Sequence, residues 1–280
     1  MTAGNRLLCF GLGYTAQAFT RRLGPDWAVI GTTRGGDGGA LRFDRDHPLP
    51  REKFAGATHI LVSIPPDEQG DPVIDIHGAD IAAVSSLHWV GYLSTTGVYG
   101  TRDGGWGDEA AALHPTGRRG ERRVAAETAW LGLWRNTAVP VHLFRLAGIY
   151  GPGRSAFDGL RAGAAKRIDS PGQVFSRIHV DDIASVLLAS IARPRPGAIY
   201  NVCDDEPAAG ADVVAYAAKL LGVDPPPLLP LDAADLTPMA RSFYVDNKRV
   251  ANALVKRELG MRLAYPNYRA GLAAILAASG

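Results

Sequence analysis

A glycine turn near the N-terminus has the composition of a phosphate-binding loop. It reads Phe10-Gly11-Leu12-Gly13-Tyr14-Thr15-Ala16 and lies between an apolar run and a helical pattern. Small residues let the chain turn sharply and bring backbone N–H groups close to a pyrophosphate, towards which the following helix directs its positive end. The turn therefore predicts dinucleotide binding by Gly11, Gly13, Tyr14, Thr15 and Ala16. A glycine-rich turn without a ligand is the alternative.

The end of the next apolar run indicates which dinucleotide is bound. An acidic side chain about 20 residues after the turn would hold the ribose 2′-hydroxyl of NAD. The sequence instead has Thr33 and Arg34 at this position. The forked donors of arginine match a phosphate, so the pair favours NADP over NAD. An exposed loop arginine is the alternative interpretation.

The third and fourth apolar runs are each followed by residues that are candidates for contact with the cofactor. Asp44 follows the third run, where its carboxylate is either an acceptor for the adenine amino group or a turn cap. Ser63, Ile64 and Pro65 end the fourth run. Ligands of parallel sheets bind at the carboxyl ends of the strands, so these residues are expected beside the cofactor. A loop stiffened by proline is the structural alternative.

The pattern of apolar runs predicts the elements that position these residues. Short β-branched or aromatic runs alternate with helical patterns, which is typical of parallel strands joined by right-handed crossover helices. The expected fold is α/β, a Rossmann-type doubly wound parallel sheet in residues 1–150, with a small substrate lobe in 151–280 from which some segments return to the sheet. Expected strands cover residues 6–10, 27–32, 58–63, 88–94, 139–146, 174–178 and 198–202, with a short strand ending near 43; expected helices cover 14–23, 73–87, 120–136, 157–166, 181–191, 211–221, 247–259 and 268–278. The proline-rich run 224–230 is expected to be a loop.

Several blocks along the chain resemble the extended and atypical short-chain dehydrogenase/reductases, the NAD(P)-dependent epimerase/dehydratase group. Besides the glycine turn they are Ser94-Thr95-Thr96-Gly97-Val98-Tyr99-Gly100, Phe144-Arg145-Leu146-Ala147-Gly148-Ile149-Tyr150-Gly151-Pro152-Gly153-Arg154, Arg177-Ile178-His179-Val180-Asp181-Asp182-Ile183, and Tyr200-Asn201-Val202 with Asp204-Asp205-Glu206-Pro207. The resemblance implies a nucleotide domain, a C-terminal substrate lobe, and a loop that places Ile149 beside the nicotinamide.

The family's catalytic pattern is only partly present. In such enzymes a Ser or Thr positions the reacting oxygen, and a tyrosine four residues before a lysine transfers a proton. Thr95 matches the first position, whereas Arg119 and Arg123 stand where the tyrosine and lysine would be. Arginine keeps its proton up to about pH 12, so it can donate hydrogen bonds but cannot transfer a proton to a substrate at neutral pH. Arg123 retains the donors needed to hold the nicotinamide ribose.

Other residues are candidates for the proton and for the substrate. Tyr99 and His114 are possible proton donors, although a half-buried aromatic and an exposed loop histidine are the alternative readings. Arg119, Arg154 and Arg177 are candidates for binding an anionic substrate. Arg119 and Arg123 alternatively belong to a solvated basic helix face.

A metal site is not expected. His179, Asp181 and Asp182 crowd the start of one helix, where capping explains them better than metal binding does.

Composition excludes several classes of protein. The chain has 280 residues, 30 basic and 28 acidic side chains and a net charge of +2, too balanced for nucleic acid or an anionic membrane as the main partner. Its apolar runs are shorter than the roughly 18 residues of a membrane span. The two cysteines lie far apart, so a cytoplasmic protein is expected. Helices that flank the sheet would serve either a homodimer face or a monomer's core.

Together these features predict an NADP-dependent oxidoreductase or epimerase/dehydratase-like enzyme that acts on a small polar substrate. The alternative is a non-catalytic NAD(P)-binding sensor or partner protein that retains the fold, because fold alone does not settle function.

Overall fold

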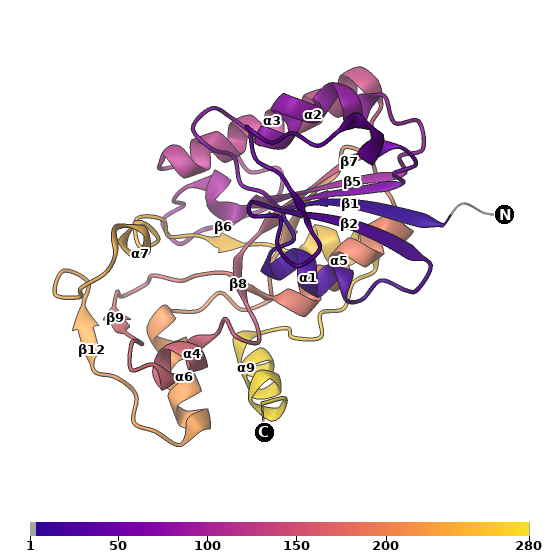
Figure 1. Ribbon diagram of the computed structural model, residues 1–280. Coiled ribbons are helices and arrows are strands. Elements are labelled where there is room, and N and C mark those ends of the chain that lie inside the picture. Colours follow the sequence, from indigo (N-terminus) through magenta and orange to yellow (C-terminus); the bar gives the residue numbers. More distant parts are fainter. Residues whose placement is uncertain (1–3, 280) are drawn as a thin grey trace.

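The computed structural model describes residues 4–279, and at its centre is a seven-stranded parallel sheet covered by helices on both faces (Figure 1). The strand order is β11 (Ile199–Val202), β7 (Val141–Leu146), β5 (Trp89–Thr95), β4 (His59–Val62), β1 (Asn5–Phe10), β2 (Trp27–Thr33) and β3 (Leu41–Arg42). Every neighbouring pair is parallel. The predicted Rossmann-type doubly wound fold is therefore confirmed.

Two apolar cores sandwich the sheet. All four residues of β4 are buried, as expected for a parallel strand that is covered on both faces. On one face lie α1 (Tyr14–Thr20) and α5 (Val180–Ala192), and on the other lie α2 (Pro72–Ala82) and α3 (Arg118–Thr137). Each face of the sheet packs into its own cluster of buried side chains, so the carboxyl ends of the strands have a rigid support.

A second group of elements lies beyond the carboxyl ends of the strands (Figure 1). It contains two small parallel sheets and three helices around a third apolar cluster. Its members are β8 (Gly148–Tyr150) with β10 (Arg177–His179), β9 (Arg167–Asp169) with β12 (Leu228–Pro230), α4 (Ala156–Arg161), α6 (Gly210–Leu221) and α9 (Tyr268–Ala277).

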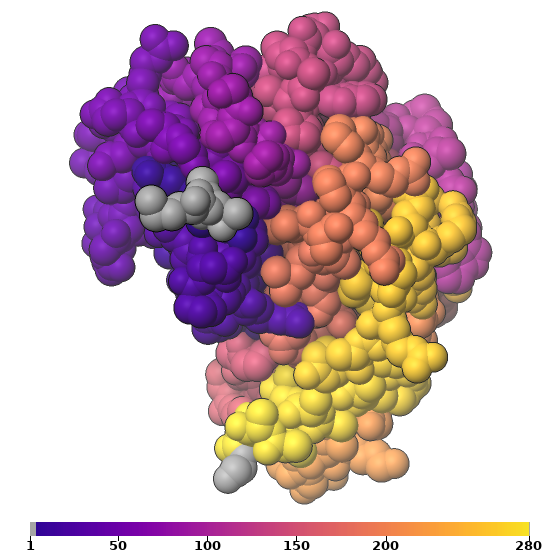
Figure 2. All heavy atoms as spheres, turned by 90° about the vertical axis from the view of Figure 1, so that its right-hand side faces the viewer, coloured from indigo at the N-terminus to yellow at the C-terminus, as the bar shows by residue number. Residues whose placement is uncertain are grey.

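Segments after residue 150 return to the central sheet. Helix α5 packs against α1, and Arg22 donates a hydrogen bond to the Asp181 carbonyl at 2.9 Å. Figure 2 shows the indigo N-terminal segment beside orange segments from later in the chain. Strand β11 joins the sheet next to β7. The domain boundary at residue 150 stays a prediction, because both groups of elements draw on the later half of the chain.

Several predicted element bounds need correction. The helix expected over 157–166 ends at Arg161, and Gly163 then adopts a φ of +64° that is suited to a turn. The strand expected over 174–178 is β10, shifted towards the C-terminus. The proline run expected to be a loop contains β12, an edge strand in which proline is tolerated.

The C-terminal half also contains elements that periodicity did not predict. Of the helix expected over 247–259, only α8 (Ala253–Leu259) is helical, because β13 (Arg249–Val250) pairs with β6 (Trp106–Gly107) instead. A short helix, α7 (Pro238–Ser242), begins at a proline and is capped by the Thr237 hydroxyl. Two short 3₁₀ helices, η1 (Arg51–Phe54) and η2 (Thr96–Tyr99), lie before β4 and after β5. Among residues 4–279, no helix is long and apolar enough to cross a membrane.

Candidate functional site

The glycine turn lies at the carboxyl edge of the sheet and is fixed to the end of β4. Gly11 has a φ of +88°, which side-chain-bearing residues rarely adopt. A Cβ atom there would approach Ile64 Cγ1 to 2.8 Å and Ser63 Oγ to 2.9 Å. The Ser63 hydroxyl donates a hydrogen bond to the Gly11 carbonyl. The backbone N–H of Gly11 donates in turn to the Thr32 hydroxyl at 3.0 Å, so both neighbouring strands hold the turn.

Gly13 offers an open backbone surface beside this turn. No atom lies within 4 Å of the position that a Cβ would take. Gly13 is the N-cap of α1 without a side-chain cap, and the first turn of the helix has no acidic residue. Thr15 and Ala16 are buried behind it. This open, uncapped and uncharged edge fits a diphosphate, because a side chain at Gly13 would fill the space that the phosphates need.

The segment after β2 combines a fixed hydroxyl with an exposed cation. The Thr33 hydroxyl accepts hydrogen bonds from the backbone N–H groups of Gly36 at 2.9 Å and Asp37 at 3.2 Å. It therefore shapes the loop, and its side chain is occupied. Arg34 is exposed, so its guanidinium is accessible to a ligand that lies along the sheet edge.

Asp44 has partners from its own turn. Its carboxylate pairs with His47 at 2.7 Å and with Arg42 at 3.3 Å, and it accepts a hydrogen bond from the Asp46 N–H at 3.0 Å. The hydrogen bond from His47 lowers the pKa of Asp44. These contacts support the turn-cap interpretation, and the adenine contact stays a prediction.

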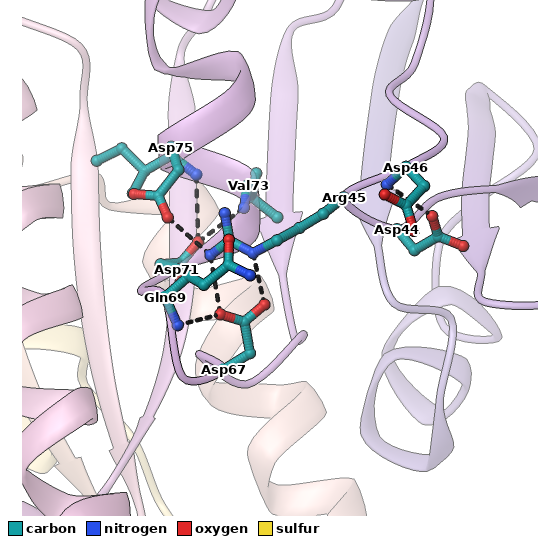
Figure 3. Close-up of polar contacts among 9 residues, drawn as sticks. Asp44, Arg45, Asp46, Asp67, Gln69, Asp71, Val73 and Asp75 are labelled. Carbon is teal, nitrogen blue, oxygen red and sulfur yellow. Dashed lines mark hydrogen bonds and ion pairs between the residues drawn. The ribbon is translucent and has the colours of Figure 1, made fainter.

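Arg45 joins the ends of β3 and β4, a feature that the sequence analysis did not single out (Figure 3). Its Nε and Nη2 atoms donate to Asp67 at 2.6 and 2.9 Å, and Nη2 also donates to Asp75 at 2.8 Å. The hydrogen bonds from Arg45 lower the pKa of Asp67. This forked contact holds the loop that carries Ile64 and Pro65 against the segment after β3.

Thr95 ends β5 and caps the short helix η2. Its hydroxyl oxygen accepts a hydrogen bond from the Gly97 N–H at 3.2 Å, and the side chain is partly exposed. A hydroxyl that accepts one bond still has its own proton to donate. Thr95 thus presents an oriented O–H donor at the same sheet edge as the glycine turn.

Arg123 lies against the end of the same strand. Its Nη1 atom donates to the Leu93 carbonyl at 2.7 Å and to the Tyr92 hydroxyl at 3.0 Å. The guanidinium carbon is 5.5 Å from the centre of the Tyr92 ring. Helix α3 therefore places a cation at the end of β5, where one of the two terminal nitrogens of Arg123 holds it.

The structure changes the interpretation of Tyr99. Its side chain is fully buried, at 0% exposure. Its hydroxyl donates to Asn201 Oδ1 at 2.7 Å and accepts from Arg145 Nη1 at 2.8 Å. Burial raises the pKa of Tyr99. Because the oxygen is enclosed and both its donor and acceptor capacity are used, we leave Tyr99 out of the proposed chemistry.

A buried ion pair supports the end of β5. Arg145 donates to both carboxylate oxygens of Glu127, with Nη2 to Oε2 at 2.8 Å, and both side chains are 3% exposed. The Ser94 hydroxyl donates to the same carboxylate at 2.5 Å. The network couples β5, β7 and α3 immediately before Thr95. The sequence signal was an arginine inside the apolar strand run Val141–Leu146, since buried arginines need partners.

The remaining predicted residues fall in separate places. Arg119 is exposed and lies 6.0 Å from the centre of the Phe243 ring. Arg154 and Arg177 line a cavity in the second group of elements. The structure thus brings two of the three predicted substrate-binding arginines together, while Arg119 is not part of that cavity lining. His114 is exposed, and Ile149 is partly buried against the main core.

The start of α5 is a structural junction, as predicted. His179 Nδ1 accepts a hydrogen bond from the Asp181 N–H at 3.2 Å and caps the helix. The Asp182 carboxylate accepts from the Ala264 and Tyr265 N–H groups at 2.8 and 3.0 Å. Within the described part of the chain, no group of three or more His, Cys, Asp or Glu side chains is arranged to hold a metal ion.

Comparison with known proteins identifies a chain that is similar over nearly its whole length. A functionally unknown conserved protein from Silicibacter pomeroyi shares 54% sequence identity, with a TM-score of 0.91 over 98% of this chain and 99% of that chain. No protein-family model matches. More distant structures share the fold: dTDP-glucose 4,6-dehydratase from Bacillus anthracis, solved with NAD, has 16% identity and a TM-score of 0.76 over 98% of this chain and 96% of that chain.

UDP-glucuronic acid 4-epimerase from Bacillus cereus, also solved with NAD, has 15% identity and a TM-score of 0.75 over 95% of this chain and 96% of that chain.

Comparison of sequences alone identifies two further proteins that are similar to part of this chain. Protein YeeZ from Escherichia coli K12 is 30% identical over 192 residues, which are 67% of this chain and 62% of that protein. The 3-diazoavenalumate denitrifying reductase from a Streptomyces species is 30% identical over 141 residues, 46% of this chain and 45% of that protein. The chain therefore matches less than two thirds of the length of either protein.

Proposed function

This chain belongs to the same family as the Silicibacter pomeroyi protein and has the fold of the NAD-dependent epimerases and dehydratases, and from that premise we propose that it is an oxidoreductase that uses a nicotinamide dinucleotide. The open backbone at Gly13 carries the proposal, because it leaves room for a diphosphate at the carboxyl edge of the sheet. When bound, the nicotinamide supplies or accepts a hydride. The substrate is a small polar molecule, and the reductase relative supports reduction as the reaction.

The residues at the end of β5 position the substrate. Thr95 donates its O–H to the reacting oxygen. The hydrogen bond that its oxygen accepts from the Gly97 N–H leaves this proton free and orients the hydroxyl. Arg123 donates its remaining N–H groups to the nicotinamide ribose, while its contact with the Leu93 carbonyl fixes the guanidinium. Ile149 packs beside the ring, and Arg119 binds an anionic group of the substrate.

The proton comes from a group other than the motif tyrosine. Arg119 stays charged at neutral pH and cannot act as an acid. Tyr99 is enclosed between Arg145 and Asn201. The exposed His114 and solvent water are the remaining donors, and an imidazole is a common general acid in enzymes.

Replacing the Thr95 hydroxyl tests the catalytic proposal. In the Thr95→Val variant we expect kcat/KM for NADPH-dependent turnover to fall about 10- to 150-fold, since a hydrogen bond to the reacting oxygen contributes roughly 1.5–3 kcal/mol. A panel of aldehydes, ketones and diazo compounds provides the substrates, with NADPH absorbance as the measurement. Thr101→Val, on a neighbouring loop, is the control. Unchanged turnover in Thr95→Val would contradict this role.

A non-catalytic NAD(P)-binding protein is the second candidate, and the arginines at positions 119 and 123 favour it. This candidate predicts tight dinucleotide binding with no turnover across the panel. It further predicts that the paired substitutions Arg119→Tyr and Arg123→Lys create turnover where the native chain has none. Turnover by the native chain would exclude it.

Arg34 is proposed to bind a 2′-phosphate and thereby to favour NADP, although two structures with the same fold hold NAD. In Arg34→Ala we expect NADPH affinity to fall by roughly 1–3 kcal/mol, a factor of about 5 to 150, because a charge-assisted contact is lost. NADH affinity should change less than twofold. Calorimetric titration of both nucleotides measures this, with the exposed Arg21→Ala as control. Equal weakening of the two nucleotides would remove the phosphate role.

A further inference from the structure

A cavity of about 300 Å³ lies within the second group of elements. It opens between α4, α6 and α9 and the small β8–β10 sheet. Its lining combines two arginines with aromatic and aliphatic walls. The lining residues are Tyr150, Arg154, Ser155, Ala156, Asp158, Arg177, Val213, Tyr268 and Leu272.

The cavity is on the opposite side of the β8–β10 sheet from the proposed nicotinamide contact. Alternate residues of a strand point to opposite faces. Tyr150 and Arg177 line the cavity, whereas Ile149 and Ile178, one position along in each strand, pack into the main core. The cavity therefore opens on the face of the β8–β10 sheet opposite Ile149, and its Arg154 also lies near Tyr14 of the glycine turn.

Arg177 brings a positive charge to this cavity. Among residues 4–279, no carboxylate forms an ion pair with its guanidinium. Its Nη1 atom donates to the carbonyls of Phe175 and Ala208, both at 2.8 Å, which fixes the guanidinium without neutralising it. Burial lowers the pKa of Arg177, but an arginine keeps its charge at neutral pH. A second, anionic partner would complete its contacts.

The nearest acidic groups are unsuited to pair with that charge. Asp204 is 1% exposed, its Oδ1 accepts a hydrogen bond from the Glu206 N–H at 3.2 Å, and burial raises its pKa to about 8. Asp158 Oδ2 accepts from the N–H and hydroxyl of Ser155 at 2.6 and 2.8 Å, and this carboxylate is the one acidic group in a lining that has two arginines. Arg154 adds another cation, with its guanidinium 5.7 Å from the Tyr14 ring centre. The cavity thus keeps an excess of positive charge.

The walls restrict what kind of anion fits. Tyr150, Val213, Tyr268 and Leu272 give the lining an apolar character. The volume is at the lower end of the roughly 300–1,000 Å³ range of ligand pockets. We propose that this cavity binds a small organic carboxylate with a flat apolar body, whose carboxylate pairs with Arg177 while the body packs against Tyr150 and Tyr268.

The test uses 3-phenylpropionate as the probe, with its uncharged amide and inorganic phosphate as comparisons. Calorimetry on the whole protein should show saturable binding of the acid, and at least tenfold weaker binding of the amide and of phosphate. Arg177→Gln removes the charge, and Val213→Phe fills the cavity from α6 without touching either arginine. Both should weaken binding of the acid at least tenfold, whereas Arg161→Gln, an exposed arginine on α4, should leave it unchanged.

Binding of NADPH to each variant is measured in parallel, so that a failure of this proposal is separate from a failure of the proposed function. Equal NADPH affinity in native, Arg177→Gln and Val213→Phe proteins shows that the variants are folded and that the two sites are distinct. The proposal is overturned if the acid gives no heat at millimolar concentration, if Val213→Phe binds it as well as the native protein does, or if NADPH displaces it competitively.

Discussion

Replacing Gly13 with aspartate is expected to reduce NADH and NADPH affinity at least 100-fold without destabilising the fold. The backbone of Gly13 is extended, with φ −87° and ψ −168°, and its Cβ would meet no atom within 4 Å, so the substitution is sterically free. Aspartate is also a favourable N-cap for α1. Its side chain and charge would, however, occupy the space proposed for the diphosphate and repel it. Calorimetry measures the affinity, and thermal unfolding measures the stability.

The matched control is Gly11→Ala in the same turn. Gly11 has a φ of +88° and a side chain there would contact Ser63 and Ile64, so we expect this substitution to lower the melting temperature as well as the affinity. A loss of nucleotide affinity without a fall in melting temperature identifies a residue needed for binding, whereas a fall in both identifies a residue needed for folding. Wild-type nucleotide affinity in Gly13→Asp would show that no diphosphate lies over this residue.

Removal of Glu127 should cause the largest loss of stability. In Glu127→Ala, the 3%-exposed Arg145 loses its carboxylate and Ser94 loses its acceptor. An uncompensated buried charge costs roughly 3–5 kcal/mol. Urea unfolding should therefore show a free energy of unfolding lower by about that amount. Thr95 follows Ser94 directly, so turnover should fall as well.

Two further variants test whether the charge imbalance causes the effect. Arg51 is 78% exposed in its ion pair with Asp80, so Arg51→Ala should change the free energy of unfolding by less than about 1 kcal/mol. The double substitution Glu127→Leu and Arg145→Met removes both charges and should recover much of the stability lost in Glu127→Ala. A double variant as unstable as the single one would contradict this explanation.

Local patterns were sufficient to predict the central sheet and the glycine turn. Apolar runs such as residues 58–63 are long enough to specify buried parallel strands, and the glycine pattern between a strand and a helix predicts the sharp turn at Gly11, which has a φ of +88°. The small strands were harder to predict. β8 and β10 have three residues each, and their pairing depends on contacts between segments that are distant in the chain.

The contacts of individual side chains were harder to predict from the sequence than the strands and helices were. Tyr99 follows a strand end where an exposed hydroxyl is reasonable, but its hydroxyl contacts Arg145 and Asn201, which are 46 and 102 positions away. The cavity beside Arg177 likewise forms only when α4, α6 and α9 pack together. Such contacts arise from tertiary packing, which neither periodicity nor motif spacing encodes.

Calorimetric titration of the native protein with NADPH and NADH tests the central claim most directly. We expect saturable binding of one nucleotide per chain, with NADPH the tighter ligand, and a matching rise in melting temperature. Absence of heat and of any thermal shift with both nucleotides at millimolar concentration would contradict the account.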